Sequence, residues 1–582
     1  MLCRCAKQLV TVPADLAIWT WLFDSDYSPL KKHSSSNLGG YTNAITGERL
    51  SWADVKRHTT HLSTALVERY GLKPGETVAL FSPNTVWYPV AVFAIHRAGG
   101  VMSGASPAYT ADEMAYALKV SQAKFLMTVP GSMEVAAVAA EQAGLAKENI
   151  FLLEGEMSGY TNIKQLISAG EECGETGQIP PFRIPAGETN RDVVAFLSFS
   201  SGTTGLPKAV MIAHSNMISQ VVQVAQITRP EYRKALAVLP LFHITGLVHL
   251  LHLPIYLNIE VYMMPFYNLE TMLNVISKNR IKDLCLVPPI IIQMTRAPKS
   301  LRNKYDCSFM ENVMSGAAPL SAEILQVFQE RFPQSTFKQG YGMTESCSCI
   351  TLTFPQFQGY AYAHYAGNIV ASTLVKIVDP TSGKDCGYEE EGEIWARGPQ
   401  IVMGYLNNET ATRETFDKDG YLHTGDIGKI DNRGLLLVTD RLKEMIKVKG
   451  IPVAPAELED LLLGHELVED CAVLGIKDDL AGERPKAYIV LRASAAADEQ
   501  RLENSCQALM QYVKDKKNRN KWIVEFEVAD EIPKSASGKI LRRVLRDISS
   551  TGAPGRNSGK SATRKHVGFV FRDKSRTERA KL

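Results

Sequence analysis

The amino-acid sequence predicts an α/β protein in which a large N-terminal domain, with β-sheets covered by helices, is followed by a small α+β C-terminal domain. Its 582 residues exceed the length over which one hydrophobic core keeps growing. Apolar runs alternate with helix-like segments, which is typical of covered sheets. Beyond residues 440–443 the expected elements become shorter. We therefore expect domains at 1–440 and 441–550 and a basic tail at 551–582. Beyond Asp547 the chain is rich in Gly, Ser, Lys and Arg and shows no apolar period, so the tail is expected to be disordered.

The pattern of apolar residues places the individual elements. A helix is expected at 322–332, where Ser321 can cap a segment with one apolar face. Segment 154–189 is rich in Gly, Glu and Pro and is expected to be a surface loop. Segment 235–267 is apolar but is interrupted by prolines and histidines, so buried strands and turns are expected there instead of a membrane span. The other expected elements are strands at 77–81, 124–128, 193–199, 210–212, 283–287, 311–314, 471–476, 487–491 and 522–528, and helices at 455–463 and 502–514.

Composition excludes several classes of protein. With 45% apolar and 22% charged residues, the bulk of the chain is neither fibrous nor disordered. The ten cysteines show no zinc-ligand spacing and no disulfide framework, so reduced thiols in an intracellular compartment are expected. The apolar run 16–23 follows Asp15 and precedes no small-residue cleavage site, which argues against a secretory signal. No transmembrane segment is expected.

A phosphate-binding loop is indicated at 198–208, which reads SFSSGTTGLPK between two apolar strands. Glycines let backbone N–H groups approach a polyphosphate, hydroxyls add donors and Lys208 adds positive charge. The alternative is a flexible Ser/Gly turn. The spacing excludes a Walker A motif, because Ala209 follows the lysine.

Over residues 15–547 the chain resembles the adenylate-forming (AMP-binding) superfamily, which includes acyl-CoA synthetases, 4-coumarate-CoA ligases, luciferases and the adenylation domains of peptide synthetases. The resemblance rests on ordered motifs: SSGTTGLPK at 200–208, LPLFHITG at 239–246, SGAAPL at 315–320, QGYGMTE at 339–345, YLHTGD at 421–426, DRLKEMIKVKG at 440–450 and PKSASGK at 533–539. It implies that the small domain is mobile and rotates between two half-reactions.

By position in these motifs, the resemblance implies an ATP site. Glu345 is the expected ligand of Mg²⁺, because this ion prefers carboxylate and phosphate oxygens. The ion would also neutralise negative charge as pyrophosphate leaves. Asp426 would accept hydrogen bonds from the ribose hydroxyls, and the ring of Tyr341 would stack on adenine. The expected ATP-binding residues are Ser201, Gly202, Thr203, Thr204, Gly205, Lys208, Gly316, Ala317, Ala318, Gln339, Gly340, Tyr341, Gly342, Thr344, Asp426 and Arg441.

The resemblance also implies the catalytic groups. Lys539 would lie between the attacking carboxylate and the α-phosphate and would stabilise the transition state by its charge. His243 would position the carboxylate, which has no proton to lose at neutral pH. Lys443 occupies the hinge position. The acyl pocket is expected at Phe242, His243, Thr245, Gly316 and Gly340, and Lys447, Lys449 and Gly450 would face coenzyme A, Lys447 with a catalytic role. Pro452 departs from the glutamine of the ligases and luciferases.

The implied function is an acyl-CoA ligase that activates a hydrophobic carboxylic acid with ATP, Mg²⁺ and coenzyme A. Its combination of architecture and terminus is similar to that of peroxisomal fungal ligases of secondary metabolism. An alternative is a stand-alone enzyme that loads a carrier-protein thiol. A remote alternative is nucleic-acid binding through the tail, where nine Lys and Arg stand against two acids; against it, the tail lacks interleaved aromatics, and no nucleic acid is expected as a partner.

The C-terminal tripeptide Ala580, Lys581 and Leu582 resembles a peroxisomal targeting signal that an import receptor would read. Peroxisome is therefore the expected location, with cytoplasm as the alternative.

Overall fold

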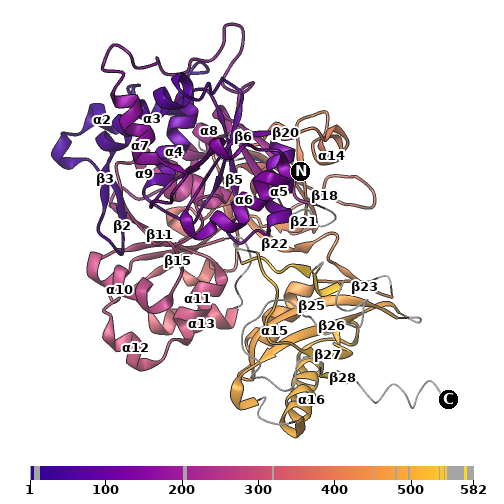
Figure 1. Ribbon diagram of the computed structural model, residues 1–582. Coiled ribbons are helices and arrows are strands. Elements are labelled where there is room, and N and C mark those ends of the chain that lie inside the picture. Colours follow the sequence, from indigo (N-terminus) through magenta and orange to yellow (C-terminus); the bar gives the residue numbers. More distant parts are fainter. Residues whose placement is uncertain are drawn as a thin grey trace.

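The computed structural model describes residues 2–4, 13–200, 206–316, 320, 322–449, 451–478, 481–495, 499–535, 538–542, 544–546 and 569–572. A large body carries three β-sheets with helices on their faces, and a smaller body, orange to yellow in Figure 1, carries a fourth sheet with α15 and α16. The predicted fold class, a large N-terminal α/β domain followed by a small α+β domain, is confirmed. In the described part of the chain, no helix is long and apolar enough to cross a bilayer.

The first sheet has a parallel centre. Strand β4 pairs in parallel with β5 and β6, and β5 pairs in parallel with β9. All residues of β4 and β5 are buried, as expected for strands covered on both faces. In sheet order the strands are β20 (Gly404–Tyr405), β10 (Lys208–Ala213), β9 (Val194–Ser200), β5 (Val101–Ala105), β4 (Thr77–Phe81), β6 (Ala123–Thr128), β7 (Ile150–Leu152) and β8 (Thr161–Asn162).

The second sheet changes direction at β15. Strands β13, β14 and β15 are parallel, whereas β15 pairs with β16 antiparallel. In sheet order the strands are β1 (Leu2–Arg4), β18 (Leu374–Val378), β19 (Gly392–Arg397), β21 (Leu422–Ile430), β22 (Leu435–Arg441), β17 (Gly367–Ile369), β16 (Ser348–Leu352), β15 (Thr336–Met343), β14 (Asn312–Ser315) and β13 (Asp283–Leu286).

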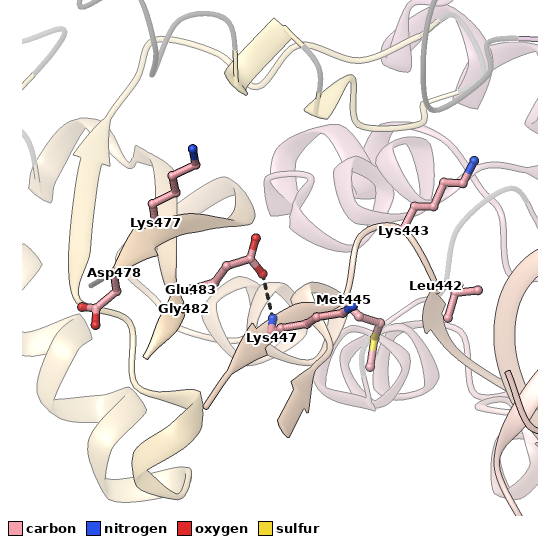
Figure 2. A pocket seen from close by; sticks show the side chains of 8 residues that line it. All are labelled: Leu442, Lys443, Met445, Lys447, Lys477, Asp478, Gly482 and Glu483. Carbon is pink, nitrogen blue, oxygen red and sulfur yellow. Dashed lines mark hydrogen bonds between the residues drawn. The ribbon is translucent and has the colours of Figure 1, made fainter. Parts of the chain in front are cut away.

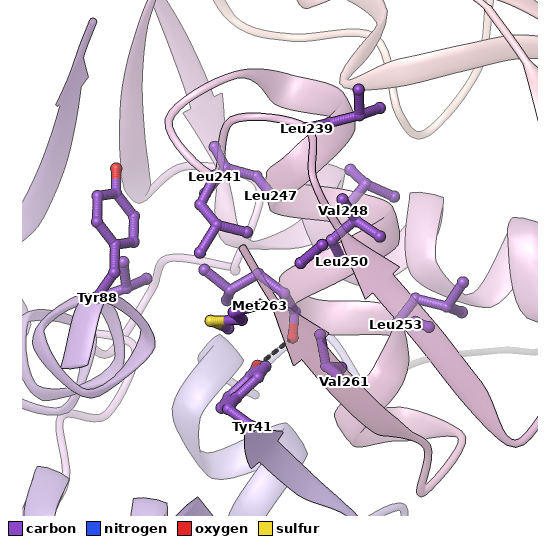
Figure 3. Close-up of a cluster of buried hydrophobic side chains, with 14 of the residues drawn as sticks. Tyr41, Tyr88, Leu239, Leu241, Leu247, Val248, Leu250, Leu253, Val261 and Met263 are labelled. Carbon is purple, nitrogen blue, oxygen red and sulfur yellow. Dashed lines mark hydrogen bonds between the residues drawn. The ribbon is translucent and has the colours of Figure 1, made fainter. Parts of the chain in front are cut away.

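The third sheet packs against a π-helix at Gly246–His252. The fully buried Tyr41 of β2 donates a hydrogen bond of 2.6 Å to the carbonyl oxygen of Leu251 (Figure 3). Leucine and valine side chains surround this bond, so the π-helix is fixed in the core. In sheet order the strands are β11 (Lys234–Ala237), β12 (Glu260–Met263), β2 (Gly40–Asn43) and β3 (Arg49–Ser51).

Several helices begin with a capping box, in which a side chain accepts from a free backbone N–H group. Ser51 with Asp54 caps α3, and Thr110 with Glu113 caps α5. The helices of the large body are α1 (Ile18–Phe23), α2 (Pro29–Lys32), α3 (Trp52–Glu68), α4 (Trp87–Arg97), α5 (Ala111–Ser121), α6 (Met133–Ala143), α7 (Ile163–Glu171), α8 (His214–Ala225), α9 (Leu253–Tyr256), α10 (Leu269–Asn279), α11 (Pro288–Arg296), α12 (Lys299–Lys304), α13 (Ala322–Arg331) and α14 (Glu409–Thr415).

The small body has its own hydrophobic core. Leu458 of α15 and Leu502 and Leu509 of α16 pack against its sheet. Its helices are α15 (Pro455–Leu463) and α16 (Glu499–Lys516), and its strands are β23 (Ile446–Val448), β24 (Ile451–Val453), β25 (Val468–Asp478), β26 (Gly482–Leu491), β27 (Glu525–Val528) and β28 (Val570–Arg572).

Segment 154–189 was predicted to be a loop, and this prediction was wrong. It contains α7, which Asn162 and Gln165 begin with a capping box. Gly170 lets this helix approach α3, since a Cβ there would lie 1.8 Å from the carbonyl oxygen of His61. The helix has nine residues between Gly- and Glu-rich flanks, so its apolar period was too short to recognise.

Segment 235–267 was predicted to consist of strands and turns, which is correct only at its ends. Strands β11 and β12 are present, but the π-helix and α9 lie between them. Pro254 misled the prediction: it stands in the first turn of α9, where a missing N–H costs nothing.

The tail was predicted to lack structure beyond residue 547, and residues 569–572 contradict this. Strand β28 extends the small sheet by antiparallel pairing with β27. Phe569 and Phe571 pack against the small core, and Arg572 forms an ion pair with Glu525. The other predicted strands and helices agree with the structure to within a few residues, and Ser321 lies outside the described residues.

Candidate active site

Several predicted site residues fall outside the part of the chain that the structure describes. They belong to the phosphate loop, the adenine segment, the coenzyme A-facing segment and the C-terminus. They are Ser201, Gly202, Thr203, Thr204, Gly205, Ala317, Ala318, Gly450, Ala580, Lys581 and Leu582.

Tyr405, which the sequence analysis did not predict, connects Lys208 with Glu345. Lys208 begins β10, and β20 pairs with β10 so that Tyr405 lies opposite Val210. The Nζ atom of Lys208 lies 4.7 Å from the centroid of the Tyr405 ring. The Tyr405 hydroxyl donates to Oε1 of Glu345 over 2.9 Å. Only the strand pairing reveals Tyr405, because Gly-Tyr alone carries no functional signal.

A second group forms around Asp426, which is 4% exposed. The register of β21 and β22 places Arg441 opposite, with Nε 3.1 Å from Oδ1 of Asp426. The hydroxyl of Tyr341 donates to Oδ2 over 2.7 Å. Burial raises the pKa of Asp426, and the charge of Arg441 opposes this rise. Both carboxylate oxygens are thus held in a fixed direction.

The residues between these groups are placed by tight backbone packing. A Cβ on Gly342 would lie 1.6 Å from the carbonyl oxygen of Ser348, so only glycine fits where β15 meets β16. Gln339 is buried, and its side-chain amide donates to the carbonyl of Ala363. Thr344 begins a single 3₁₀ turn that also contains Glu345.

Lys539 comes from the small body and reaches this cluster. Burial, followed by the charge of Arg441, lowers the pKa of Lys539 to about 8, while Asp426 and Glu345 act in the opposite direction. A turn holds the lysine backbone, because its N–H donates to the Ser535 hydroxyl. The structure therefore brings Lys539, Asp426, Glu345 and Arg441 within electrostatic range of one another.

Gly538 forms the contact between the two bodies beside Lys539. Its φ of +82° lies in the left-handed region, and a Cβ there would lie 3.1 Å from Cγ of Pro289. Pro289 belongs to the first turn of α11. The absence of a side chain thus lets the lysine turn rest against the large body.

His243 lies within electrostatic range of Lys539 as a neutral ring. Burial, and then the charge of Lys539, lowers the pKa of His243 to about 4. The N–H of Thr245 donates to its Nδ1 over 3.3 Å, so the proton of the neutral ring is on Nε2. Such a ring can donate to a carboxylate but cannot gain charge near pH 7. The neighbouring Phe242 packs on Gly104, where a Cβ would lie 3.1 Å from the Phe242 carbonyl oxygen.

The predicted hinge and coenzyme A-facing lysines lie elsewhere. Lys443 and Lys447 line a pocket of about 790 Å³ together with Leu442, Met445, Lys477, Asp478, Gly482 and Glu483 (Figure 2). The backbone N–H of Lys447 donates to Glu483 over 2.7 Å. Lys449 is exposed with a φ of +53°, and Pro452 lies opposite Lys447 in the β23–β24 pair. None of the lining residues belongs to the Lys539 cluster.

Comparison with protein families gives two matches along the chain. The AMP-binding enzyme family matches residues 34–406, and the AMP-binding enzyme C-terminal domain matches residues 457–539. Among similar proteins, 4-coumarate--CoA ligase-like 1 of Arabidopsis thaliana is 36% identical over 515 residues, which cover 87% of this chain and 90% of that protein. Peroxisomal OPC-8:0-CoA ligase 1 of the same plant is 31% identical, with 88% and 91% covered.

Solved structures share the fold. The anthranilate CoA ligase in complex with anthranoyl-AMP superposes with a TM-score of 0.79 at 23% identity and covers 93% of this chain and 98% of its own. The o-succinylbenzoate coenzyme A synthetase from Bacillus subtilis, in complex with ATP and magnesium ion, gives a TM-score of 0.72 at 24% identity and covers 92% and 100%.

The contact at Gly538 predicts a selective loss. Gly538→Ala should lower acid-dependent pyrophosphate release by at least about tenfold, because the added Cβ meets Pro289 and moves Lys539 out of the cleft. Gly434→Ala is the matched control: its φ is +79° and no atom lies within 4 Å of the added Cβ. Equal effects of the two substitutions would show that backbone strain alone, of about 1 kcal/mol, is responsible.

Proposed function

This chain belongs to the AMP-binding enzyme family, and we propose that it is an AMP-forming acyl-CoA ligase whose substrate is a largely hydrophobic carboxylic acid. The observation that carries this proposal is the entry of Lys539 into the cluster of Asp426, Glu345 and Arg441. The family match and the relatives, which cover the chain almost end to end, favour coenzyme A over a carrier protein as the thiol.

We propose that the first half-reaction takes place in this cleft. A carboxylate oxygen bonds to the α-phosphorus of ATP while the bond from that phosphorus to pyrophosphate breaks, which gives acyl-AMP and pyrophosphate. The two reactants are anions, so their approach needs positive charge without proton donation. Lys539 supplies that charge, and Nε2–H of His243 directs the carboxylate.

Asp426 is well suited to bind the two hydroxyls of a ribose, because Arg441 and Tyr341 hold its oxygens in place. Lys208, at the end of the predicted phosphate loop, is assigned to the β- and γ-phosphates. Tyr341, in the same cluster, is assigned to adenine.

The residues present fit a magnesium ion held mainly by substrate phosphates. No group of three His, Cys, Asp or Glu side chains gathers as a metal cage in the described ranges, and Mg²⁺ usually takes one or two carboxylates plus phosphate oxygens. Glu345, oriented by Tyr405, is the carboxylate that would hold it. When bound, the ion neutralises charge on the departing pyrophosphate.

For the second half-reaction we propose that the small body rotates about Lys443 relative to the large body, which keeps Arg441 at the end of β22. The thiol of coenzyme A then bonds to the acyl carbon, and AMP leaves. In the present arrangement Lys447 and Lys449 are exposed, and the pocket that Lys447 lines contains no residue of the Lys539 cluster, which supports a rotation that brings them there. Gly450 and the neighbouring Pro452 would then face the pantetheine arm.

Substitution of Lys539 should affect the rates of the two half-reactions differently. We expect Lys539→Ala to abolish acid-dependent pyrophosphate release, because the two anions then meet without a counter-charge, and to leave thioester formation from supplied acyl-adenylate largely intact. Both rates can be measured on the purified chain, with Lys534→Ala in the same loop as a control, since Lys534 pairs with Asp470. Equal loss in both assays would contradict the assignment.

The lowered pKa of Lys539 predicts a descending limb in the pH profile. Lysine acts in its charged form, so kcat/KM for adenylation should fall as pH rises through about 8. Lys539→Arg should move this limb upward, because guanidinium keeps its proton. An unmoved limb in that variant would assign the titration to another group.

We further propose that the chain is imported into peroxisomes through Ala580, Lys581 and Leu582. One relative is named as peroxisomal, which supports this proposal. Deleting Leu582 from a fusion with an N-terminal fluorescent protein should make punctate fluorescence diffuse, because the receptor reads the terminal residue. Unchanged puncta would defeat the proposal.

A further inference from the structure

One face of the parallel strands β13, β14 and β15 carries partly exposed side chains inside the large body. The register aligns Cys285 with Met314 and Met314 with Lys338. Alternate residues share a face, so Gly316 and Gly340, each two residues further on, lie on it as well. These aligned residues keep accessible surface, whereas the residues between them are buried. Lys338 therefore lies roughly 7 Å along β15 from Gly340, one of the two glycines assigned to the acyl pocket.

The π-helix and β16 close the space beside this face. His249 of the π-helix lies 3.2 Å from the hydroxyl of Ser348 and 3.6 Å from the sulfur of Cys349. A Cβ on Gly340 would lie 3.8 Å from the same sulfur. An imidazole, a hydroxyl and a thiol thus lie beside Gly340, which is one of the residues assigned to the acyl pocket.

The ammonium of Lys338 adds a positive charge beside these polar side chains. Within the described residues, no hydrogen bond and no ion pair involves its ammonium. Asp283 is an acid within electrostatic range, but Arg229 pairs with it over 3.0 Å and Asn312 donates to it over 2.6 Å. Burial lowers the pKa of Lys338, and its charge adds to the effect of burial on His249.

A buried lysine of the small body, Lys486, shows how the chain treats a desolvated ammonium that has a structural role. The ammonium of Lys486 lies 2.7 Å from carboxylate oxygens of both Glu525 and Glu527. Desolvating an ammonium is costly unless it is paired, and Lys486 is paired twice. Lys338 is desolvated as well, but no described residue forms an ion pair or a hydrogen bond with its ammonium.

We propose that Lys338 determines acid specificity by binding an anionic group at the end of the substrate remote from the reacting carboxylate. The substrate class is then a dicarboxylic acid with an apolar middle, an inference that rests on the acyl-CoA ligase function proposed above. The two carboxylates are distinguished by position: one meets His243 and Lys539, and the other meets Lys338.

The test compares straight-chain α,ω-dicarboxylic acids of six to twelve carbons with monocarboxylic acids of equal length. Pyrophosphate release by the full chain, with ATP and Mg²⁺, gives kcat/KM for each acid. At one chain length or more, the wild type should prefer the diacid by at least about tenfold, since a site built for a polar group rejects an analogue that lacks it. Lys338→Met should remove the preference, and Lys338→Arg should retain part of it.

Lys282→Met is the matched control, because Lys282 is an exposed lysine directly before β13 that pairs with Glu311. It should leave the ratio of diacid to monoacid unchanged. If monoacids of every length are used as well as diacids, or if Lys338→Met lowers both equally, the inference fails while the ligase function stands. If no acid of either class releases pyrophosphate, the ligase function itself fails.

A binding measurement keeps the test independent of turnover and of the folding of one variant. Acyl-sulfamoyl adenosines that end in a carboxylate should raise the melting temperature of the wild-type chain more than those that end in a methyl group. Equal shifts for the two series would overturn the role of Lys338.

Discussion

The ammonium of Lys539 lies within the electrostatic field of charged groups from both bodies, and the proposed site depends on this meeting. Asp426, Glu345 and Arg441 come from the large body, and Glu444 comes from the small body. Gly538 permits the approach, because it accepts a left-handed φ and presents no side chain to Pro289. If the contact between the two bodies at Gly538 opens, Lys539 leaves the cluster. One site could then serve both half-reactions of the proposed mechanism.

The large body supplies a rigid frame for this encounter. Lys208 begins β10, Tyr341 lies in β15 and Asp426 lies in β21, so these three side chains are held by strands. Tyr405 joins the two large sheets, since it pairs with β10 through its backbone and binds Glu345 through its hydroxyl. The distance between Lys208 and the carboxylate of Glu345 therefore depends on the pairing of β20 with β10.

The sequence predicted the fold class and most strands, because buried parallel strands are continuous apolar runs with clear ends. It missed α7, whose packing depends on Gly170 meeting the backbone of α3, and β28, which is held by pairing with β27. Such tertiary contacts leave no period in the local sequence. Motifs located Asp426, Glu345 and Lys539, but Tyr405 and Lys338 required the pairing of strands distant along the chain. The roles of these residues stay predictions.

Within the part of the chain that the structure describes, the ammonium groups of Lys539 and Lys338 have no ion-pair or hydrogen-bond partner, and their surroundings share one arrangement. Near Lys539, Arg441 and Tyr341 engage Asp426, and Tyr405 engages Glu345. Near Lys338, Arg229 and Asn312 engage Asp283 in the same way. Each of these carboxylates thus accepts hydrogen bonds from other side chains and forms no ion pair with the nearby lysine. Its negative charge still acts on the ammonium from a distance. Burial lowers the pKa of both ammonium groups. A cation that has lost its hydration water and has no ion-pair partner gives an incoming anion the largest gain in electrostatic binding energy.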